Sequence, residues 1–196
     1  MSRAVRRYRR WETETRQHAW EDARRLALEL YHGRPGGISA YGIGVVLEPG
    51  EIVYRQVWVR YYTLGTTPDL LDQRGRFYPG MPSWRNWGLC TTLVTSHRLV
   101  TRVAGDSGRL ISNWWAQIAG VQIDLDRETV TMDDRLSEWR GAYIGPAAPV
   151  ITVAAVERVY GAVTLLDHPG LGQLRSRTDR ITKQTGKGAR WAFEVS

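Results

Sequence analysis

Hydrophobic and polar residues alternate along much of the middle of the chain, a pattern typical of strands with one buried face. In residues 52–62 the odd positions hold Val53, Val57 and Val59, whereas an even position holds Trp58. β-branched and aromatic residues of this kind favour strands. Similar stretches separated by turn-forming residues predict an antiparallel sheet with further strands over residues 42–51, 89–102, 109–124, 128–134 and 139–144.

Two helices are expected, one before and one after these strands. Residues 11–31 carry an apolar stripe at three- and four-residue spacing, which includes Trp20, Ala23 and Leu30. We expect this stripe to pack on the chain's own domain. Residues 150–163 are apolar around most of the helix circumference, so this second helix should be buried against the sheet.

One long segment, residues 63–86, fits neither the helical nor the strand pattern as a whole. It contains three prolines together with several glycines and arginines. We interpret it as a long loop. Long ordered loops often carry function, which makes this segment a candidate contact region.

The net charge of +7 is concentrated at the two ends of the chain. Residues 1–10 carry five arginines and no acid, and residues 172–196 carry a net charge of +4, which leaves −2 for residues 11–171. Basic ends suit anionic lipid, nucleic acid or an acidic protein surface. The residues expected to contact such a surface are Arg3, Arg6, Arg7, Arg9 and Arg10.

Composition divides the chain into four parts. We expect a basic arm, a helix with its linker, one folded domain and a basic tail, over residues 1–10, 11–37, 38–175 and 176–196. A domain of this length is large enough to bury a hydrophobic core of its own.

No catalytic, cofactor or metal-binding motif stands out. Gly105-Asp-Ser-Gly108 is similar to the nucleophile segment of trypsin-like proteases, but the surrounding histidine and aspartate motifs are missing. The segment suits a tight turn better. Cys90 and the four histidines show no ligand spacing. We therefore expect a protein that is not an enzyme and has no metal or cofactor.

Cysteine content and hydropathy predict a cytoplasmic location. A single cysteine excludes an internal disulfide framework and fits a reducing compartment. No apolar run approaches the ~20 residues that span a bilayer, and the start of the chain lacks the apolar core of a secretory signal. Attachment at the membrane periphery through the basic ends stays open as an alternative.

Tryptophan and arginine lie together at three places, and this composition is typical of interaction hot spots. Trp114 and Trp115 are adjacent, so on a strand one should lie in the core while the other faces the opposite side. We expect partner contacts from the loop and from this pair, through Arg74, Arg76, Trp84, Arg85, Trp87, Trp114 and Trp115.

Four short motifs add a family resemblance. Leu-Glu-Pro-Gly-Glu at residues 47–51 leads into a strand, and Leu-Val-Thr-Ser-His-Arg-Leu-Val spans residues 93–100. Ser-Asn-Trp-Trp-Ala-Gln-Ile-Ala-Gly-Val spans residues 112–121, and Leu-Gly-Gln-Leu-Arg spans residues 171–175. The two middle motifs resemble the vTnrRLl and w..i.gv strands of the pleckstrin-homology-like (PH-like) and GRAM families. The chain also looks like uncharacterised actinobacterial or actinophage proteins with such a core, over residues 41–175.

The resemblance implies an α+β fold, namely a PH-like antiparallel sheet or partly open barrel capped by a C-terminal helix, here with an N-terminal amphipathic helix. It also implies a non-catalytic binding module, because related sheets bind lipid headgroups, peptides or other domains. The basic pattern of a phosphoinositide site is missing around Arg55 and Arg60, which favours protein–protein interaction. Two alternatives stay open, peripheral binding to anionic membrane and non-specific nucleic-acid binding, both through the basic ends.

Overall fold

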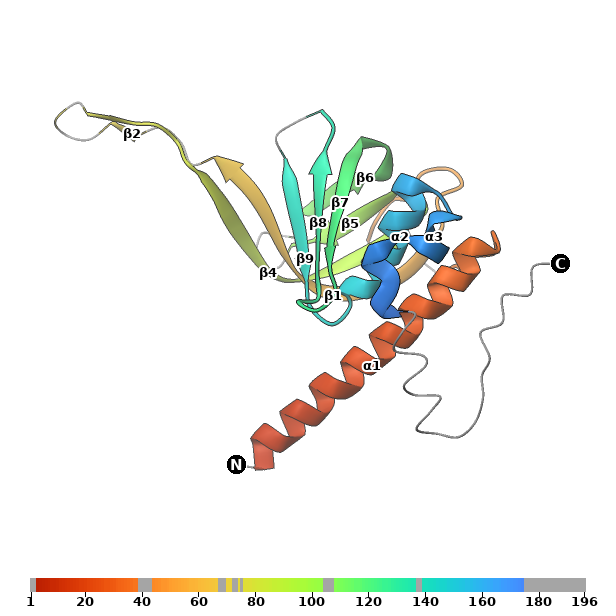
Figure 1. Cartoon of the computed structure of the whole chain (residues 1–196). Coiled ribbons are helices and arrows are strands. Elements are labelled where there is room, and N and C mark those ends of the chain that lie inside the picture. Colours follow the sequence, from red (N-terminus) through yellow and green to blue (C-terminus); the bar gives the residue numbers. More distant parts are fainter. Residues whose placement is uncertain are drawn as a thin grey trace.

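The computed structural model describes residues 3–38, 44–66, 70–71, 74, 76–103, 108–136 and 139–174, with the backbone alone for residues 3–12, 70, 71 and 78. Within these residues, seven strands form one antiparallel sheet that curls into a half-barrel (Figure 1). They are β1 (Val53–Thr66), β4 (Pro82–Thr95), β5 (Arg98–Arg102), β6 (Leu110–Trp114), β7 (Ile118–Asp124), β8 (Thr129–Asp134) and β9 (Arg140–Ile144). A small ribbon pairs β2 (Leu70–Leu71) with β3 (Phe77–Tyr78). The helical elements are α1 (Arg3–Tyr31), η1 (Trp115–Gln117), α2 (Ala148–Tyr160), α3 (Thr164–Asp167) and η2 (Pro169–Leu171).

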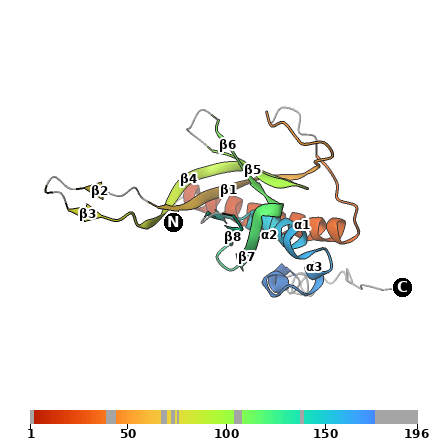
Figure 2. The ribbon, with the colours of Figure 1, turned by 90° about the horizontal axis from the view of Figure 1, so that it is seen from above.

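The strand order across the sheet is β6-β5-β4-β1-β9-β8-β7, so β1 lies at the centre. On one side β4, β5 and β6 follow as antiparallel neighbours, and on the other side β9, β8 and β7 do so. The chain then enters α2, which lies against the sheet (Figure 2). The predicted α+β class, a PH-like curled sheet with an N-terminal and a C-terminal helix, is confirmed.

The core lies between the inner face of the sheet and the two long helices. Ile151, Val153 and Val156 of α2 are inaccessible to solvent, as the apolar composition of this helix predicts. α1 crosses α2 and buries Trp20 and Leu26 from its predicted stripe (Figure 1). The amphipathic helix therefore packs on its own domain.

Four elements differ from the sequence prediction. Residues 89–102 contain parts of two strands rather than one, because a bend at residues 96–97 separates β4 from β5. α1 begins at Arg3 rather than at residue 11, so the basic segment continues the helix, and the N-terminal end of α1 extends past the body (Figure 1). Residues 44–51 form no strand; Val45 and Leu47 instead pack against apolar residues of the sheet. Residues 109–124 contain two strands, because η1 bends the chain between β6 and β7.

The turn predicted after residue 124 is present, and the backbone N–H of Arg127 donates a hydrogen bond to Asp124 Oδ1 (3.1 Å). Two other predicted segments cannot be compared in this way. Most of the turn at residues 105–108 and all of the basic tail at residues 176–196 lie outside the described residues.

A hydrogen-bonded polar network is buried inside the half-barrel. The side-chain amide of Asn113 donates to the hydroxyls of Tyr143 (2.5 Å) and Tyr61 (3.3 Å), whose rings stack with centroids 4.8 Å apart. The hydroxyls of Thr92 and Thr101 are hydrogen-bonded to each other (3.1 Å). Buried polar groups stabilise a fold only when they are paired. This network therefore helps to hold β6, β1 and β9 in one arrangement.

The two buried tyrosines are expected to resist ionisation. Burial raises the pKa of Tyr61 from 10.0 to about 12 and raises the pKa of Tyr143 well above 10.0. Because the folded-state pKa exceeds the unfolded value, the protonated hydroxyl of Tyr61 contributes stability below pH 10.0 that is lost as the pH rises through about 12. A titration by tyrosinate absorbance and circular dichroism should show exposed tyrosines ionising first and these two only as the fold is lost. Ionisation of all nine tyrosines with the fold intact would contradict the buried network.

Candidate interaction surface

The segment expected as a loop is mostly a long β-ribbon that projects from the body (Figures 1 and 2). β1 and β4 are each 14 residues long and remain paired as far as Thr66 and Pro82. Pairing of β1 with β9 ends at Leu64, and pairing of β4 with β5 reaches only to Thr91. Beyond these positions the two described strands pair only with each other. We call the described part of residues 62–86 the arm.

A bulge at Gly88 determines which side chains face outward on the ribbon. The register of β1 and β4 shifts by one residue there, and Gly88 has a φ of 78°, which glycine adopts without strain. Trp87 therefore lies on the inner side, where its indole Nε1 donates to the hydroxyl of Thr63 (2.9 Å). Trp84 lies on the opposite, outer face.

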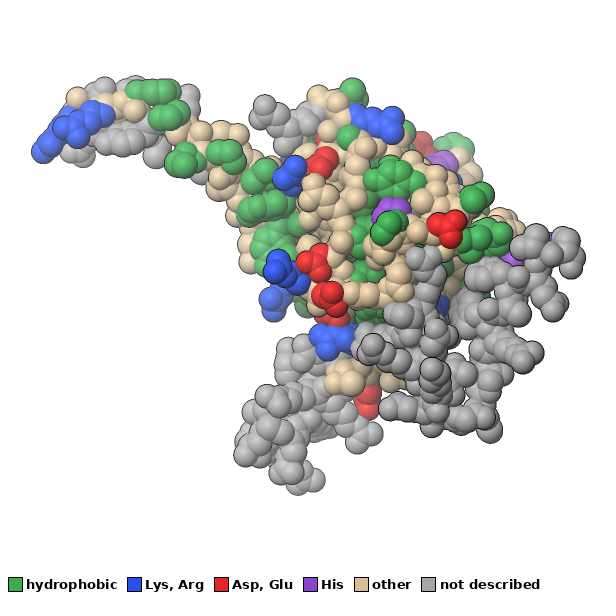
Figure 3. All heavy atoms as spheres, viewed as in Figure 1, with side chains coloured by type: hydrophobic (Ala, Val, Ile, Leu, Met, Phe, Trp, Pro, Cys, Tyr) green, Lys and Arg blue, Asp and Glu red, His purple; other side chains and the backbone are tan. Residues whose placement is uncertain are grey.

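Large apolar side chains are exposed along the described part of this ribbon. Within the body, the outer face presents Trp58 and Leu89, which are 59% and 56% exposed. On the arm, Phe77, Met81 and Trp84 are 61%, 69% and 46% exposed. We call these five residues the ribbon surface. Figure 3 shows hydrophobic side chains following one another from the arm to the body.

Arginines lie on both faces of the ribbon, Arg60 beside the ribbon surface and Arg85 and Arg109 on the inner side with Trp87. Arg60 is exposed and lies opposite Leu89 in the strand register. The guanidinium carbon of Arg85 lies 3.7 Å from the centroid of the Trp87 ring, and that of Arg109, just before β6, lies 5.7 Å from it. Stacking on an aromatic ring positions a guanidinium while its N–H groups remain able to donate at the edge.

Residues 44–51 cover the part of the sheet next to the ribbon surface. Val45 and Leu47 pack against a small buried cluster that includes Leu93 and Val100. The apolar outer face of the sheet thus has a covered part and, around Trp58, an exposed part.

A buried ion pair holds this covering segment in place. Arg98 donates from Nε to Glu51 Oε1 (3.0 Å) and from Nη2 to Glu51 Oε2 (3.0 Å) and the carbonyl of Val46 (2.8 Å). The hydroxyl of Thr95 donates to Glu51 Oε1 (2.6 Å), and Arg98 lies 4.6 Å from the ring centroid of Trp114. Burial raises the pKa of Glu51, but the hydrogen bonds from Arg98 and Thr95 outweigh it and hold that pKa below 4.5.

The predicted contact residues on the arm and at its base differ in how far they are exposed to solvent. Arg74, Arg76, Trp84 and Arg85 are exposed, whereas Trp87 is half-buried against the core. The structure describes only the backbone of the residues expected to contact an anionic surface, which are Arg3, Arg6, Arg7, Arg9 and Arg10.

The adjacent pair of tryptophans separates into a core residue and a partly exposed one. Trp115 is 5% exposed and belongs to η1, and its indole Nε1 donates to the carbonyl of Thr95 (2.9 Å). It is therefore not accessible to a partner, contrary to the expected contact. Trp114 is half-buried beside Arg98.

Sequence reasoning missed four of the five residues of the ribbon surface. The alternation in β1 did place Trp58 on the face opposite Val59, but it could not show which of the two faces the helices cover. The sequence predicted Phe77 and Met81 only as part of the long loop over residues 63–86, without a contact role. A β-ribbon with exposed apolar side chains has no distinctive sequence pattern, because its strands bury neither face fully.

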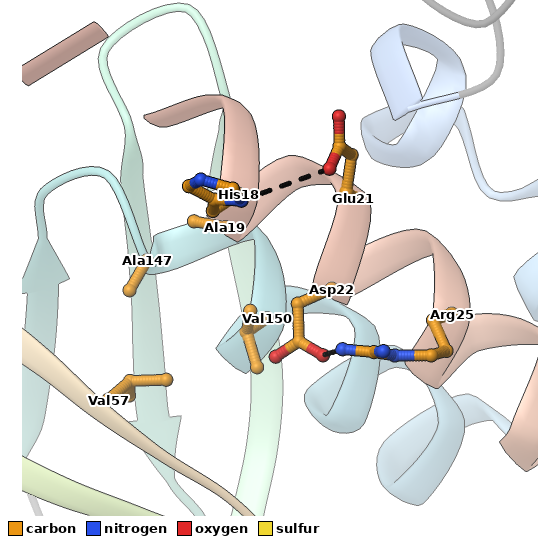
Figure 4. Close-up of a pocket in the computed structure, with 8 residues that line it drawn as sticks. All are labelled: His18, Ala19, Glu21, Asp22, Arg25, Val57, Ala147 and Val150. Carbon is orange, nitrogen blue, oxygen red and sulfur yellow. Dashed lines mark hydrogen bonds and ion pairs between the residues drawn. The ribbon is translucent and has the colours of Figure 1, made fainter. Parts of the chain in front are cut away.

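A shallow hollow of about 500 Å³ lies between α1, β1 and the start of α2 (Figure 4). Asp22 pairs with Arg25 (2.7 Å) and Arg55 (2.8 Å), and Glu21 lies 4.0 Å from His18. The charged groups of the hollow therefore largely satisfy one another. The lining residues are His18, Ala19, Glu21, Asp22, Arg25, Val57, Ala147 and Val150.

In the part of the chain that the structure describes, no three His, Cys, Asp or Glu side chains are grouped so that they could hold a metal ion. None of the described helices has the length and apolarity needed to cross a membrane. Models of known protein families and curated protein sequences give no match to the chain. The ribbon surface is thus the main structural guide to function.

Proposed function

We propose that this protein is a non-catalytic interaction module that binds another protein through the ribbon surface. The arm carries this proposal, because it projects from the body with Phe77, Met81 and Trp84 exposed (Figure 1). A two-stranded ribbon is only marginally stable alone in water, and exposed apolar side chains gain free energy on burial. A protein partner would cover the apolar side chains and provide packing that the arm lacks.

Two tryptophans provide anchors on the outer face of the ribbon. Trp84 lies opposite Leu64 on the arm, and Trp58 lies opposite Thr91 on the body. These two register positions are about 20 Å apart along an extended strand. Interface tryptophans often dominate binding energy. A partner that contacts both would span the junction between the rigid body and the arm.

Affinity capture from native lysate, with nuclease treatment and lipid analysis of the eluate, tests this function. The wild-type chain should retain a protein partner at high salt. The double variant Trp84→Ser, Met81→Ser should bind that protein at least about tenfold more weakly, because truncating a hot-spot residue removes buried apolar contact. The control Leu136→Ser, Val163→Ser replaces two side chains that are 82% and 74% exposed outside the ribbon, and it should bind like wild type.

Circular dichroism should show that both double variants remain folded, because all four substituted side chains are exposed. Equal retention of the partner by the two variants would contradict binding through the ribbon surface. Nucleic acid or anionic lipid that leaves the column at high salt would instead favour the basic ends as the binding element.

A further inference from the structure

We propose that residues 191–196 of a second copy of this chain bind beside the arm as an added strand, on the edge of β4 that has no neighbouring strand. The choice of partner rests on the proposed function of the ribbon surface. It follows from an open strand edge and from a sequence pattern that matches both faces of the ribbon at that edge.

One edge of β4 lacks a neighbour along the arm. β4 pairs with β1 on one side as far as Pro82, but on the other side β5 pairs only with Thr91–Val94, so no described strand lies on that side of the arm. An unpaired edge presents backbone N–H and C=O groups that can pair with another chain. Pro82 and the bulge at Gly88, whose N–H donates to Asn86 Oδ1 (2.8 Å), bound this edge. We call the stretch between them, residues 83–87, the open edge.

Residues 191–196, which lie outside the described residues, have the sequence pattern of a strand. They read Trp-Ala-Phe-Glu-Val-Ser, so that Trp191, Phe193 and Val195 occupy the odd positions, with smaller or polar residues between them. Aromatic and β-branched residues at alternate positions favour a strand with one apolar face. The segment therefore has the pattern that pairing with the open edge requires.

The apolar side of this segment matches the outer face of the ribbon. Successive side chains of a strand point to opposite faces of a sheet, so all three apolar side chains can lie on the face that carries Trp84 and Leu89. These two side chains of β4 are 46% and 56% exposed. Apolar side chains on neighbouring strands gain free energy when they cover one another.

The other side of the segment matches the inner face, where two arginines have no carboxylate partner. The guanidinium carbons of Arg85 and Arg109 lie 3.7 and 5.7 Å from the centroid of the Trp87 ring, and within the described residues no carboxylate forms an ion pair with either arginine. A strand whose apolar side chains face outward directs Glu194 inward, to the face of these guanidinium groups. Arg190 shares this side but lies about 13 Å from Glu194 along an extended strand. One strand thus offers apolar contact to the outer face and a carboxylate to the inner face.

The place where the described chain ends favours a second copy over docking within one copy. α3, which leads to the last described residue, Leu174, lies on the opposite side of the body from the arm (Figures 1 and 2). The carbonyl of Leu174 accepts a hydrogen bond from Arg24 Nε of α1 (3.0 Å), so the chain leaves from the helical side. The residues between Leu174 and Trp191 span at most about 53–58 Å when fully extended. A path half-way around a compact body roughly 37 Å across takes about as much before it reaches the arm.

A bilayer and a nucleic acid fit the open edge less well than a polypeptide. The edge offers backbone hydrogen bonds at the spacing of a strand, which an extended polypeptide matches. Arg74 and Arg76 are exposed between β2 and β3, toward the end of the arm, and charged side chains are costly in the hydrocarbon region of a bilayer.

Sedimentation of the full chain and two variants tests docking in a second copy. Wild type should associate as its concentration rises. The ribbon variant Trp84→Ser, Met81→Ser and the segment variant Trp191→Ser, Phe193→Ser should each associate at least about tenfold more weakly, because each lacks one half of the contact. An equimolar mixture of the two should associate more strongly than either alone, since one copy then supplies the ribbon and the other the segment.

The control Leu136→Ser, Val163→Ser should associate like wild type, because it replaces two exposed apolar side chains outside the ribbon. Circular dichroism checks that each variant is folded. Hydrogen exchange of wild type should slow at residues 83–87 as association increases, because a strand on the open edge would pair with their backbone.

A labelled peptide of residues 188–196 tests the strand pattern by fluorescence anisotropy, with the full-length segment variant as the receiving protein. The wild-type peptide should bind at least about tenfold more tightly than the peptide Ala192→Phe, Phe193→Ala. The two peptides have the same composition, but the exchanged order no longer places the aromatic side chains on one face. Non-specific apolar adhesion would bind both equally.

The carboxylate contact is tested in the same assay. Glu194→Gln in the peptide should weaken binding about twofold to fivefold, and this difference should disappear when the receiving protein also carries Arg85→Gln, Arg109→Gln. A receiving protein with Arg25→Gln, Arg127→Gln, two exposed arginines elsewhere on the body, should keep the difference.

Four outcomes would overturn the second copy as the partner. They are a wild-type chain that does not associate at any concentration, equal binding of the two peptides of the same composition, a Glu194→Gln effect that survives in the Arg85→Gln, Arg109→Gln protein, and peptide binding without association in the mixture. The last outcome would place the segment on the ribbon of its own copy.

The proposed function is separable from this choice of partner. If affinity capture retained a different protein, or if wild type bound phosphatidylserine vesicles, and the ribbon variant lost that binding, the second copy would be overturned as the occupant. In the first case protein binding through the ribbon surface would still stand. Equal capture of every protein by the ribbon variant and wild type would instead contradict both.

Discussion

Replacing Glu51 with glutamine is expected to lower the free energy of unfolding by about 3–5 kcal/mol at neutral pH, because it breaks a buried ion pair. The Glu51 side chain is inaccessible to solvent and accepts two hydrogen bonds from Arg98 and one from Thr95. Glutamine has nearly the same size, but it cannot balance the buried guanidinium charge. Urea unfolding of wild type and variant, monitored by tryptophan fluorescence, measures the difference.

The effect of this substitution should depend on pH. The pKa of Glu51 is lower in the folded protein than its ordinary value of 4.5, so the ionised carboxylate contributes stability above pH 4.5. That contribution is lost as the pH falls below 4.5 toward the folded-state pKa. The difference in unfolding free energy between wild type and Glu51→Gln should therefore shrink on acidification.

A neighbouring glutamate provides the control. Glu48 is exposed, and Glu48→Gln should change the unfolding free energy by no more than about 0.5 kcal/mol. A similarly small effect of Glu51→Gln would show that the ion pair does not hold residues 44–51 on the sheet. Loss of this cover would expose Leu93 and Val100 and enlarge the apolar face beside Trp58.

Much of the fold follows from sequence patterns because burial imposes a period on the chain. The stripe of Trp20, Ala23 and Leu30 is buried in α1, and Val57 and Val59 of β1 lie in the same core, as predicted. Val53 is also buried, but a bulge between Val53 and Arg55 places it in the smaller cluster with Leu93 and Val100 instead of on the predicted face. Each pattern extends over several residues and has one face against the core. Such patterns are strong signals because a shift of one residue would turn the apolar side chains outward.

The arm illustrates where these patterns fail. Beyond Leu64, β1 has no second neighbour among the described strands and no core to bury, so alternation no longer constrains its sequence. The prolines and glycines of residues 63–86 then dominate the sequence and predict a loop. Pro82 is tolerated at the start of β4 because it lies at the end of a two-stranded ribbon, where proline costs few sheet hydrogen bonds.

The candidate site was predictable only in part for a related reason. Tryptophan–arginine clustering drew attention to residues 84–87, whose two tryptophans lie on opposite faces of the ribbon because they are three positions apart on one strand. The bulge at Gly88 decides that Trp87 rather than Trp84 faces the core, and a bulge depends on how two strands pair, which composition does not reveal. The contact between Arg109 and Trp87 joins residues from different strands and has no local signal.

Replacing Leu26 with alanine is expected to lower the free energy of unfolding by about 2–5 kcal/mol, because it leaves a cavity in a closely packed core. Leu26 is inaccessible to solvent and lies in the core cluster where α1 crosses α2. Urea unfolding measures the loss. The matched control Leu136→Ala makes the same chemical change at a side chain that is 82% exposed, and its effect should stay within about 0.5 kcal/mol.

This substitution also separates the scaffold from the interaction surface. Leu26 packs beneath the sheet, whereas Trp84 and Trp58 lie on its outer face. Folded Leu26→Ala protein should therefore retain the protein partner of the ribbon surface as wild type does in affinity capture, since distant and independent sites act additively. Equal stability of Leu26→Ala and Leu136→Ala would contradict the packing of α1 on α2. Weakened partner binding by the folded variant would instead show that α1 controls the geometry of the ribbon.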